Sequence, residues 1–239
     1  MSLRDFGWNE VYFLLLSTKW TIVLSLIAFA GGGLLGLAVA AARVAPIRRL
    51  RHAAAIWIRI FQGTPLLVQL LLMYYGTAFI GLRPDAWLAA SLTLSLNSSA
   101  FFGEIWRGCI ESIGIGQWDG ARALGLRFLP TLRLVVLPQA MRVMLAPTIG
   151  YMVQIVKSTS VASLIGLAEL TRTAVLVNTV TFEPISVFGL VALTYFFLCW
   201  PLSLLAEHLG QRIDSKRASG IGDIFRNRPT ARPVAVVER

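Results

Sequence analysis

The sequence has few charged residues and few of the side chains that usually perform catalysis. Only 14% of its 239 residues are charged, whereas soluble domains carry about a quarter. Its two histidines, His52 and His208, are far apart, which disfavours an enzyme built on a catalytic cluster. Its two cysteines, Cys109 and Cys199, are isolated, and their spacing predicts neither a disulfide framework nor a metal site. We therefore expect no catalytic residue and no metal ligand in this chain.

Long hydrophobic runs dominate the sequence instead. Hydrophobic residues make up 56% of the chain, and its mean hydropathy is +0.69. Residues 21–42 carry no charge over a length that crosses the hydrocarbon layer, about 30 Å thick, as a helix. This composition predicts an all-α membrane protein with five transmembrane helices in a domain of residues 21–206. The predicted spans are 21–42, 65–80, 84–110, 142–163 and 185–205.

The beginning of the sequence lacks the features of a cleavable signal peptide. Asp5 and Glu10 interrupt its short apolar stretch, and the first full span is too long for the hydrophobic region of such a signal. Residues 1–20 are therefore predicted to remain as an external segment. Trp8 and Trp20 indicate that part of this segment lies at the membrane interface.

The positive charges are distributed unevenly between the two sides of the predicted membrane domain. Seventeen of the 22 lysines and arginines fall in the segments 43–59, 107–142 and 207–239, which all lie on one side. The positive-inside rule makes that side the cytoplasm, so the N-terminus is predicted outside and the C-terminus inside. The net charge of +10 is thereby explained by topology and by contact with anionic membrane lipid, without a nucleic-acid partner. Residues 207–239 are predicted to be a basic cytoplasmic tail.

A glycine cluster in the first span matches the residue pattern of a nucleotide-binding motif but lacks the secondary structure that the motif requires. The run GGGLLG at residues 31–36 matches G-x-G-x-x-G, but that fingerprint requires a strand before it and a helix starting at it. Here it lies inside a continuous apolar helix. Gly32 and Gly36 instead form a small-xxx-small pair, which predicts close helix packing.

The predicted third span is the most polar. Its polar residues are Ser91, Thr93, Ser95, Asn97, Ser98, Ser99 and Glu104. Such groups are costly at membrane depth unless they find partners in the bundle or line a watery cavity. For Asn97, near mid-span, a role in a transport pathway and a role in packing both remain open. Glu104 precedes Arg107 by three residues, and this spacing predicts an ion pair.

One stretch between the third and fourth spans, GQWDGARALGLRFLPTLRLVVLPQA, is unlike its hydrophobic surroundings. Its turn signals predict two short cytoplasmic helices. Asp119 favours the N-terminal turn of the first, and Gly125 can supply the left-handed residue that ends it. Pro130 suits the first turn of the second helix, and Pro138 is predicted to close that helix.

The first of these two helices carries a narrow apolar stripe. Trp118, Ala121 and Leu124 recur at a spacing of three, which places them on one face. Because Gly120 and Ala121 are small, the helix could fit into a groove of another protein. The loop is therefore predicted to be a docking element.

These residues carry a resemblance to a known family. The string DGARALG, followed after nine residues by VVLP, resembles the EAA loop of ABC-transporter permeases in every spacing. Further stretches, FQGTPLLVQ, LNSSAFFGEIWRGCIESI, LPQAMR and KSTSVASLIGLAELT, resemble permeases of the polar amino acid uptake family. The sequence departs from the family pattern in having Asp119 for Glu, Gly120 for Ala, and Gln62 where Arg is frequent.

The resemblance implies the membrane subunit of a type I importer in a bacterial inner membrane. Two permease chains, identical or homologous, would form the pathway, with a cytoplasmic ABC ATPase dimer and an external amino acid binding protein as partners. The resemblance implies no cofactor in this chain, because ATP and Mg would bind the ATPase. The loop 114–138 would seat in an ATPase cleft through Asp119, Gly120, Ala121, Leu124, Gly125 and Pro138. A stand-alone secondary amino acid transporter is the alternative, but such transporters usually have repeated halves and intramembrane carboxylates, and five spans with one marginal Glu fit that class badly.

A polar amino acid inside the membrane needs a partner for its carboxylate, and Lys157 is the candidate. It could equally snorkel to the outer surface or neutralise a carboxylate of a partner subunit. No Asp or Glu lies between Asp119 and Glu169, which favours neutral or acidic substrates over cationic ones. Glu169 and Arg172 are spaced for an ion pair, or for contact with the binding protein. The predicted pathway residues are Gln69, Asn97, Ser98, Lys157, Ser158 and Thr159.

Overall fold

The protein is helical throughout the part that the structure describes. This computed structural model describes residues 6–226, with side chains described as far as residue 211. The α-helices are α1 (Trp8–Val44), α2 (Arg48–Gly63), α3 (Leu66–Tyr74), α4 (Ala86–Glu111), α5 (Ile115–Ala123), α6 (Phe128–Pro130), α7 (Leu137–Ser158), α8 (Leu170–Thr181) and α9 (Pro184–Arg226). Shorter helical turns are the 3-10 helix η1 (Gly76–Ile80), the π-helix η2 (Thr131–Val136) and the 3-10 helix η3 (Thr159–Ile165).

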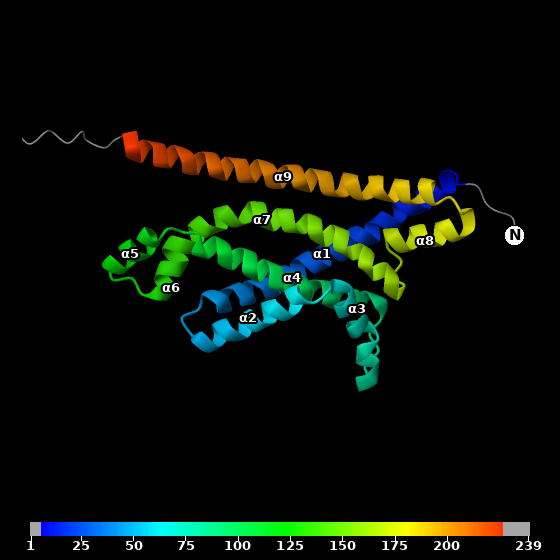
Figure 1. The fold of residues 1–239 in the computed structure, drawn as a ribbon, viewed down its shortest axis with the longest axis horizontal. Coiled ribbons are helices and arrows are strands. Elements are labelled where there is room, and N and C mark those ends of the chain that lie inside the picture. The colour runs from blue at the N-terminus through cyan, green and yellow to red at the C-terminus, as the bar shows by residue number, and fades with distance from the viewer. Residues whose placement is uncertain (1–5, 227–239) are drawn as a thin grey trace, which may run out of the picture.

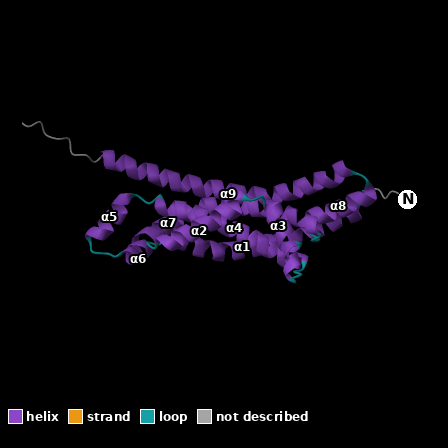
Figure 2. Cartoon of the chain, turned by 60° about the horizontal axis from the view of Figure 1, so that its bottom comes forward, coloured by secondary structure: helices purple, strands orange, loops and turns teal. Residues whose placement is uncertain are grey.

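The long helices lie side by side in an elongated bundle. In Figure 1, α1, α4, α7 and α9 follow the long axis, α5 and α6 lie at one end, and α8 lies near the N-terminus at the other. Figure 2 shows the same separation of α5 and α6 from α8 in a second orientation. The helix α3 departs from the bundle on the side opposite α9 (Figure 1). The two ends of the bundle therefore present different elements to the two sides of a membrane.

Among the described residues, three helical segments are long and apolar enough to cross a membrane, namely Trp8–Val44, Phe128–Ile165 and Pro184–Gln211. The pair Arg48–Gly63 and Leu66–Ile80, bent by 98°, would add a fourth as one broken span. The predicted third span falls on α4, whose 26 residues are about 39 Å long. Its many polar side chains keep α4 below the hydropathy of the other three, so the count of five spans is not confirmed.

The first helix begins earlier than the sequence analysis expected. The sequence predicts a segment of residues 1–20 that is separate from the first span, but α1 continues without a break from Trp8 to Val44. Leu14 is fully buried in a cluster with Leu170 of α8 and Val187 of α9. Burial of this side chain explains why the first two turns of α1 belong to the bundle rather than to a separate interfacial segment.

Glycines allow α1 and α4 to approach closely. A Cβ atom added at Gly32 would lie 2.5 Å from Cβ of Ser98, and one added at Gly36 would lie 2.7 Å from Cβ of Phe102. These separations are shorter than any van der Waals contact, so only glycine fits. The predicted small-xxx-small packing is confirmed, and it joins α1 to the polar helix α4 along their lengths.

Candidate functional site

The helix α5 presents an exposed surface at one end of the molecule (Figures 1 and 2). Asp119 is exposed on it and pairs with Arg122 at 3.1 Å between Oδ1 and Nη2. Gly120 and Leu124 are exposed as well, with 82% of Leu124 accessible. The prediction that Asp119 occupies the N-terminal turn is wrong, because α5 already begins at Ile115. Asp119 instead lies in the middle of the helix, where its carboxylate is exposed and pairs with Arg122.

The opposite face of α5 is fixed to the bundle. Ala121 is buried, and the ring of Trp118 stacks on that of Phe128 with centroids 6.0 Å apart. Trp118 also packs against a cluster that contains Ile110 of α4 and Val136 at the root of α7. The predicted stripe is thus correct for Trp118 and Ala121 and wrong for Leu124, which follows the last helical turn and points away. Packing against two long helices makes α5 a stiff extension of them.

Gly125 ends α5 in the way that the sequence predicted. Its φ of 77° lies in the left-handed region, and its N–H donates to the carbonyl of Arg122 at 2.9 Å. The following N–H, of Leu126, donates back to Ala121 at 3.1 Å. No atom lies within 4 Å of the position of an added Cβ. The need for glycine is therefore conformational rather than steric.

The chain after Gly125 differs from the prediction of a second separate helix closed by Pro138. The helical turn α6 continues through the π-helix η2 directly into α7, and Pro138 lies in the first turn of α7. A proline ring collides with the carbonyl four residues earlier in a regular helix. The wider π-helical turn before Pro138 relieves that contact, so the helix continues. Pro138 thus begins the long helix instead of ending a short one.

The ends of α1 and α4 that lie nearer to α5 carry a small ionic network. Arg107 donates to Glu104 through Nε at 3.0 Å and also pairs with Glu111. Arg43 of α1 approaches the same Glu104 at 3.9 Å. The predicted pair between Glu104 and Arg107 is confirmed. The contact between Arg43 and Glu104 ties α1 to the segment of α4 that leads into α5.

Two of the predicted pathway residues, Gln69 and Asn97, meet at the break between α2 and α3. Nε2 of Gln69 donates to the carbonyls of Phe61 at 2.9 Å and Thr64 at 3.1 Å. Nδ2 of Asn97 donates to Oε1 of Gln69 at 3.1 Å and to the carbonyl of Phe61 at 3.2 Å. The two amides supply the donors that the missing helical turn would have supplied. Their positions favour the packing role that was left open for Asn97.

The remaining pathway candidates are placed elsewhere. Ser98 is buried against Gly32 in the α1–α4 contact. Thr159 is fully buried and donates to the carbonyl of Val156 at 2.7 Å. Ser158 lines a narrow gap against α3 and α4, whereas Lys157 is exposed and lies near Cys199 of α9. The structure therefore does not gather the six residues around one point within this chain.

Glu169 has a role that the sequence analysis missed. It is fully buried and caps the start of α8, accepting from the backbone N–H groups of Arg172 at 2.8 Å and Thr171 at 3.0 Å. Its carboxylate also accepts from Thr21 of α1 and Tyr195 of α9. The contact with Arg172 is thus made by the backbone rather than by an ion pair between side chains. The residues that usually cap helices are Ser, Thr, Asp and Asn, so a glutamate at this position gave no clear sequence signal for a cap.

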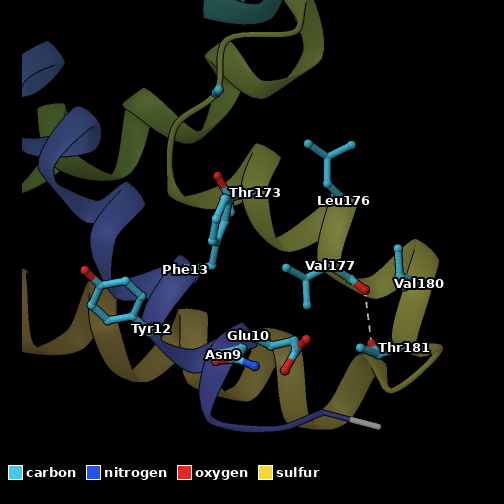
Figure 3. A pocket seen from close by; sticks show the side chains of 10 residues that line it. Asn9, Glu10, Tyr12, Phe13, Thr173, Leu176, Val177, Val180 and Thr181 are labelled. Carbon is cyan, nitrogen blue, oxygen red and sulfur yellow. Dashed lines mark hydrogen bonds between the residues drawn. The ribbon is translucent and has the colours of Figure 1, made fainter. Parts of the chain in front are cut away.

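An open groove lies between α1 and α8 at the end of the bundle opposite α5. Its volume is about 580 Å³, and Figure 3 shows Phe13 of α1 next to Thr173 and Val177 of α8, with Tyr12 on the other side of α1. The lining is mostly apolar. The sequence analysis missed this groove because it placed the start of α1 outside the bundle.

The comparisons with known proteins decide the family. The family described as binding-protein-dependent transport system inner membrane component matches residues 32–215, which include the exposed helix α5 and the long helices that hold it. The chain belongs to this family of permeases. The glutamine transport system permease protein GlnP of Escherichia coli (strain K12) is 34% identical over 208 residues, covering 86% of this chain and 95% of its own.

Other relatives agree with that assignment. The L-cystine transport system permease protein TcyB of Bacillus subtilis (strain 168) is 35% identical to this permease over 82% of this chain and 84% of its own. The crystal structure of an amino acid ABC transporter with histidines matches with a TM-score of 0.81 and 31% identity, covering 85% of this chain and 95% of that one. A MetNI methionine transporter chain, 16% identical with a TM-score of 0.71, shares the fold.

The permease thus has the helical fold of type I ABC importers, as the resemblance implied. It is an inner membrane protein of a transport system rather than a catalytic enzyme. The alternative of a stand-alone secondary transporter is not favoured, because the relatives are subunits of binding-protein-dependent systems.

Proposed function

We propose that this permease forms the translocation pathway of an importer for polar amino acids and that α5 couples it to a cytoplasmic ABC ATPase dimer. The observation that supports the proposal is that α5 has one exposed face and one face packed against the bundle. Its outer face exposes Asp119 and Gly120, which fall on the EAA spacing, while Trp118 and Ala121 fix its inner face to α4 and α7. A docking helix needs both properties, because a flexible one would absorb the motion of its partner.

The proposed coupling is mechanical. When the ATPase binds ATP and Mg and closes, the cleft that holds α5 would move, and α5 would move with it. Leu124 and Gly125 would lie at this contact, and Pro138 lies at the start of α7. Because Trp118 packs on the cluster of Ile110 and Val136, displacement of α5 would rotate α4 and α7 as rigid rods. This chain contributes no cofactor to the cycle.

The proposed orientation follows from the position of α5. With α5 in the cytoplasm, the groove of Tyr12, Phe13 and Val177 lies at the opposite, external end. An external amino acid binding protein would deliver its ligand on that side. The N-terminus is then outside and the C-terminal tail is cytoplasmic, as the distribution of arginine and lysine favours.

The proposed substrate is a neutral or acidic polar amino acid. Lys157 remains the proposed partner of its carboxylate, and it is exposed on this chain, so a ligand or a second permease can reach it. The other residues proposed for the pathway, at separate places in this chain, are Gln69, Asn97, Ser98, Ser158 and Thr159. Glutamine and cystine, which the names of two relatives specify, belong to the same chemical class.

Uptake by reconstituted vesicles tests this function. The permease would be reconstituted with the ATPase that co-purifies with it and with its binding protein, and ATP-dependent uptake would be measured across a panel of labelled amino acids. We expect uptake of glutamine, cystine or glutamate above that of arginine and histidine. Uptake restricted to arginine or histidine would contradict the substrate assignment, and uptake of sugars or inorganic ions alone would contradict the function.

A further inference from the structure

Arg59 lies deeper in the bundle than the rest of the basic segment to which it belongs. The sequence analysis counted it with the positive charges on the cytoplasmic side. In the structure, Nε1 of Trp57 donates to Oγ of Ser99 at 3.0 Å, and Nε2 of Gln62 donates to the carbonyl of Ala100 at 3.3 Å. These two contacts lie on either side of Arg59 along α2. Arg59 is therefore level with the middle of α4.

The middle of α4 lies within the hydrophobic part of the molecule. There α4 meets α1 at Gly32, where an added Cβ would lie 2.5 Å from Cβ of Ser98. Gly32 is close to the midpoint of the uncharged run 21–42. At 1.5 Å per residue, each end of that run is about 15 Å away. Arg59 therefore carries its charge at membrane depth.

One exposed face of α2 is polar from one end of the helix to the other. Arg48, His52, Arg59 and Gln62 follow one another at intervals of four, seven and three residues, which places them on one stripe. All four are exposed. The stripe starts at the end of the bundle that carries α5 and reaches the break between α2 and α3 (Figure 1). It thus connects that end of the molecule with its middle.

The other faces of α2 are apolar. Ala54 and Ile58 are buried against the bundle, whereas Ile56 and Ile60 are about half exposed. Successive residues of an α-helix are about 100° apart, so Ile60 points well away from Arg59. The isoleucine face suits lipid, but the polar stripe does not. The two exposed faces of α2 therefore have different surroundings.

The guanidinium of Arg59 needs water or an anion. No described residue forms a hydrogen bond or an ion pair with it. An arginine at membrane depth is costly unless it faces a watery cavity or an acidic partner. Glu104, the first carboxylate along α4, is already held by Arg107 and approached by Arg43. The solute that passes through the permease is then the source of a free carboxylate at this depth.

We propose that Arg59 is a specificity-determining residue, which binds the carboxylate of the transported amino acid in the half of the pathway nearer to α5. This inference rests on the proposed transport function and deepens it by adding a second cation after Lys157. Ser158, next to Lys157, lies beside Thr93 and Leu94, which are closer to the start of α4 than the level of Arg59. An amino acid that enters from the external side thus meets Lys157 first and Arg59 afterwards.

The polar stripe of α2 forms the wall of this half of the pathway. Water around the guanidinium screens its attraction, so the carboxylate is held weakly enough to leave. Arg48 continues the positive charge toward the exit. A cationic amino acid is repelled along the same wall.

Thiol labelling tests where Arg59 points. Cys109 and Cys199 would be replaced by alanine, and Arg59→Cys or Ile60→Cys would be introduced into the full chain expressed with its ATPase. In inside-out membrane vesicles, a membrane-impermeant thiol reagent should react about tenfold faster at position 59 than at position 60, because the reactive thiolate forms in water. Excess glutamate should slow the reaction at position 59, and the same concentration of arginine should not.

ATP-dependent uptake tests the need for a positive charge. Arg59→Cys should lower uptake of the amino acid that the cysteine-free parent transports best by about tenfold, the effect of losing one hydrogen bond to a charged group. An aminoethyl thiosulfonate reagent, which returns an ammonium group to position 59, should restore most of the uptake. A sulfonatoethyl reagent should not. Arg49→Cys is the matched control, because Arg49 is exposed on α2 outside the stripe, and it should retain uptake with either reagent.

The outcomes separate this inference from the transport function, which uptake by the parent tests by itself. Fast labelling that glutamate slows, together with uptake restored only by the positive group, supports the inference. Labelling no faster than at position 60, undiminished uptake in Arg59→Cys, or equal effects of the two reagents would overturn it. Restoration by charge without protection by glutamate would also overturn it, because Arg59 would then pair with a carboxylate of another chain.

A second pair of variants covers the case in which Arg59→Cys does not assemble with the ATPase. Arg59→Lys keeps the charge and Arg59→Gln removes it, while both keep a polar side chain of similar reach. Uptake retained in Arg59→Lys and reduced in Arg59→Gln supports the inference. Equal uptake by the two variants would overturn it.

Discussion

Replacing Gly125 with valine should separate the permease from its ATPase while leaving it in the membrane. Gly125 has a φ of 77°, which a β-branched residue adopts only with strain of about 1–2 kcal/mol. A cost of about 1.4 kcal/mol lowers the population of the native turn about tenfold. Co-purification of the ATPase and ATP-dependent uptake should fall by about that factor, and pull-down and vesicle uptake measure both.

The matched control for this change is Gly120→Ala. Gly120 is a helical and exposed glycine, and an added Cβ would meet nothing within 4 Å. Alanine favours a helix over glycine by about 1 kcal/mol, so this variant should retain ATPase binding and uptake. If Gly125→Val kept full ATPase co-purification and full ATP-dependent uptake, the turn after α5 would not position the contact with the ATPase.

Replacing Gly32 with alanine should destabilise the whole bundle. The new methyl group would lie 2.5 Å from Cβ of Ser98 and 3.2 Å from the carbonyl of Ser95, and neither can move without moving α4. Overpacking of this kind costs about 1–3 kcal/mol, which for a chain of this size lowers the melting temperature by about 2–12 °C. Thermal unfolding in detergent, followed by circular dichroism, measures the shift.

The neighbouring substitution Gly33→Ala provides the comparison. It makes the same chemical change one residue along α1, but its Cβ would lie 3.9 Å from Trp106, an ordinary contact. The gain in helix propensity should leave the melting temperature unchanged or slightly raised. Equal melting temperatures for the two variants would show that α1 and α4 do not pack as closely as these glycines indicate.

Local chemistry explains which features could be predicted from the sequence. Gly32 and Gly36 are four residues apart, which places both on one face of a helix and predicts close packing there. Gly125 follows a short apolar stripe and predicts the end of a helix. Each prediction needs only a few neighbouring residues. The left-handed turn at Gly125 and the close approach of α1 to α4 followed directly. The family resemblance rested on spacings of the same local kind.

The features that escaped prediction depend on residues far apart in the sequence. The break at Thr64 is held by Asn97, which lies on another helix, and Glu169 becomes a buried cap only because Thr21 and Tyr195 are packed around it. Polar residues in a hydrophobic run can either line a transport pathway or bond to other helices within the bundle. Only the fold decides between these two roles. The continuity of α6 with α7 was not predicted for another reason. A proline such as Pro138 is compatible with the end of one helix and with the first turn of the next.

Uptake by vesicles that contain the permease with and without its ATPase tests the central claim most directly. The claim is that α5 is a stiff docking helix through which a separate motor moves the membrane helices. We predict uptake only when ATPase, ATP and binding protein are all present, and none driven by a proton or sodium gradient alone. Gradient-driven uptake by the purified permease without any ATPase would contradict the account.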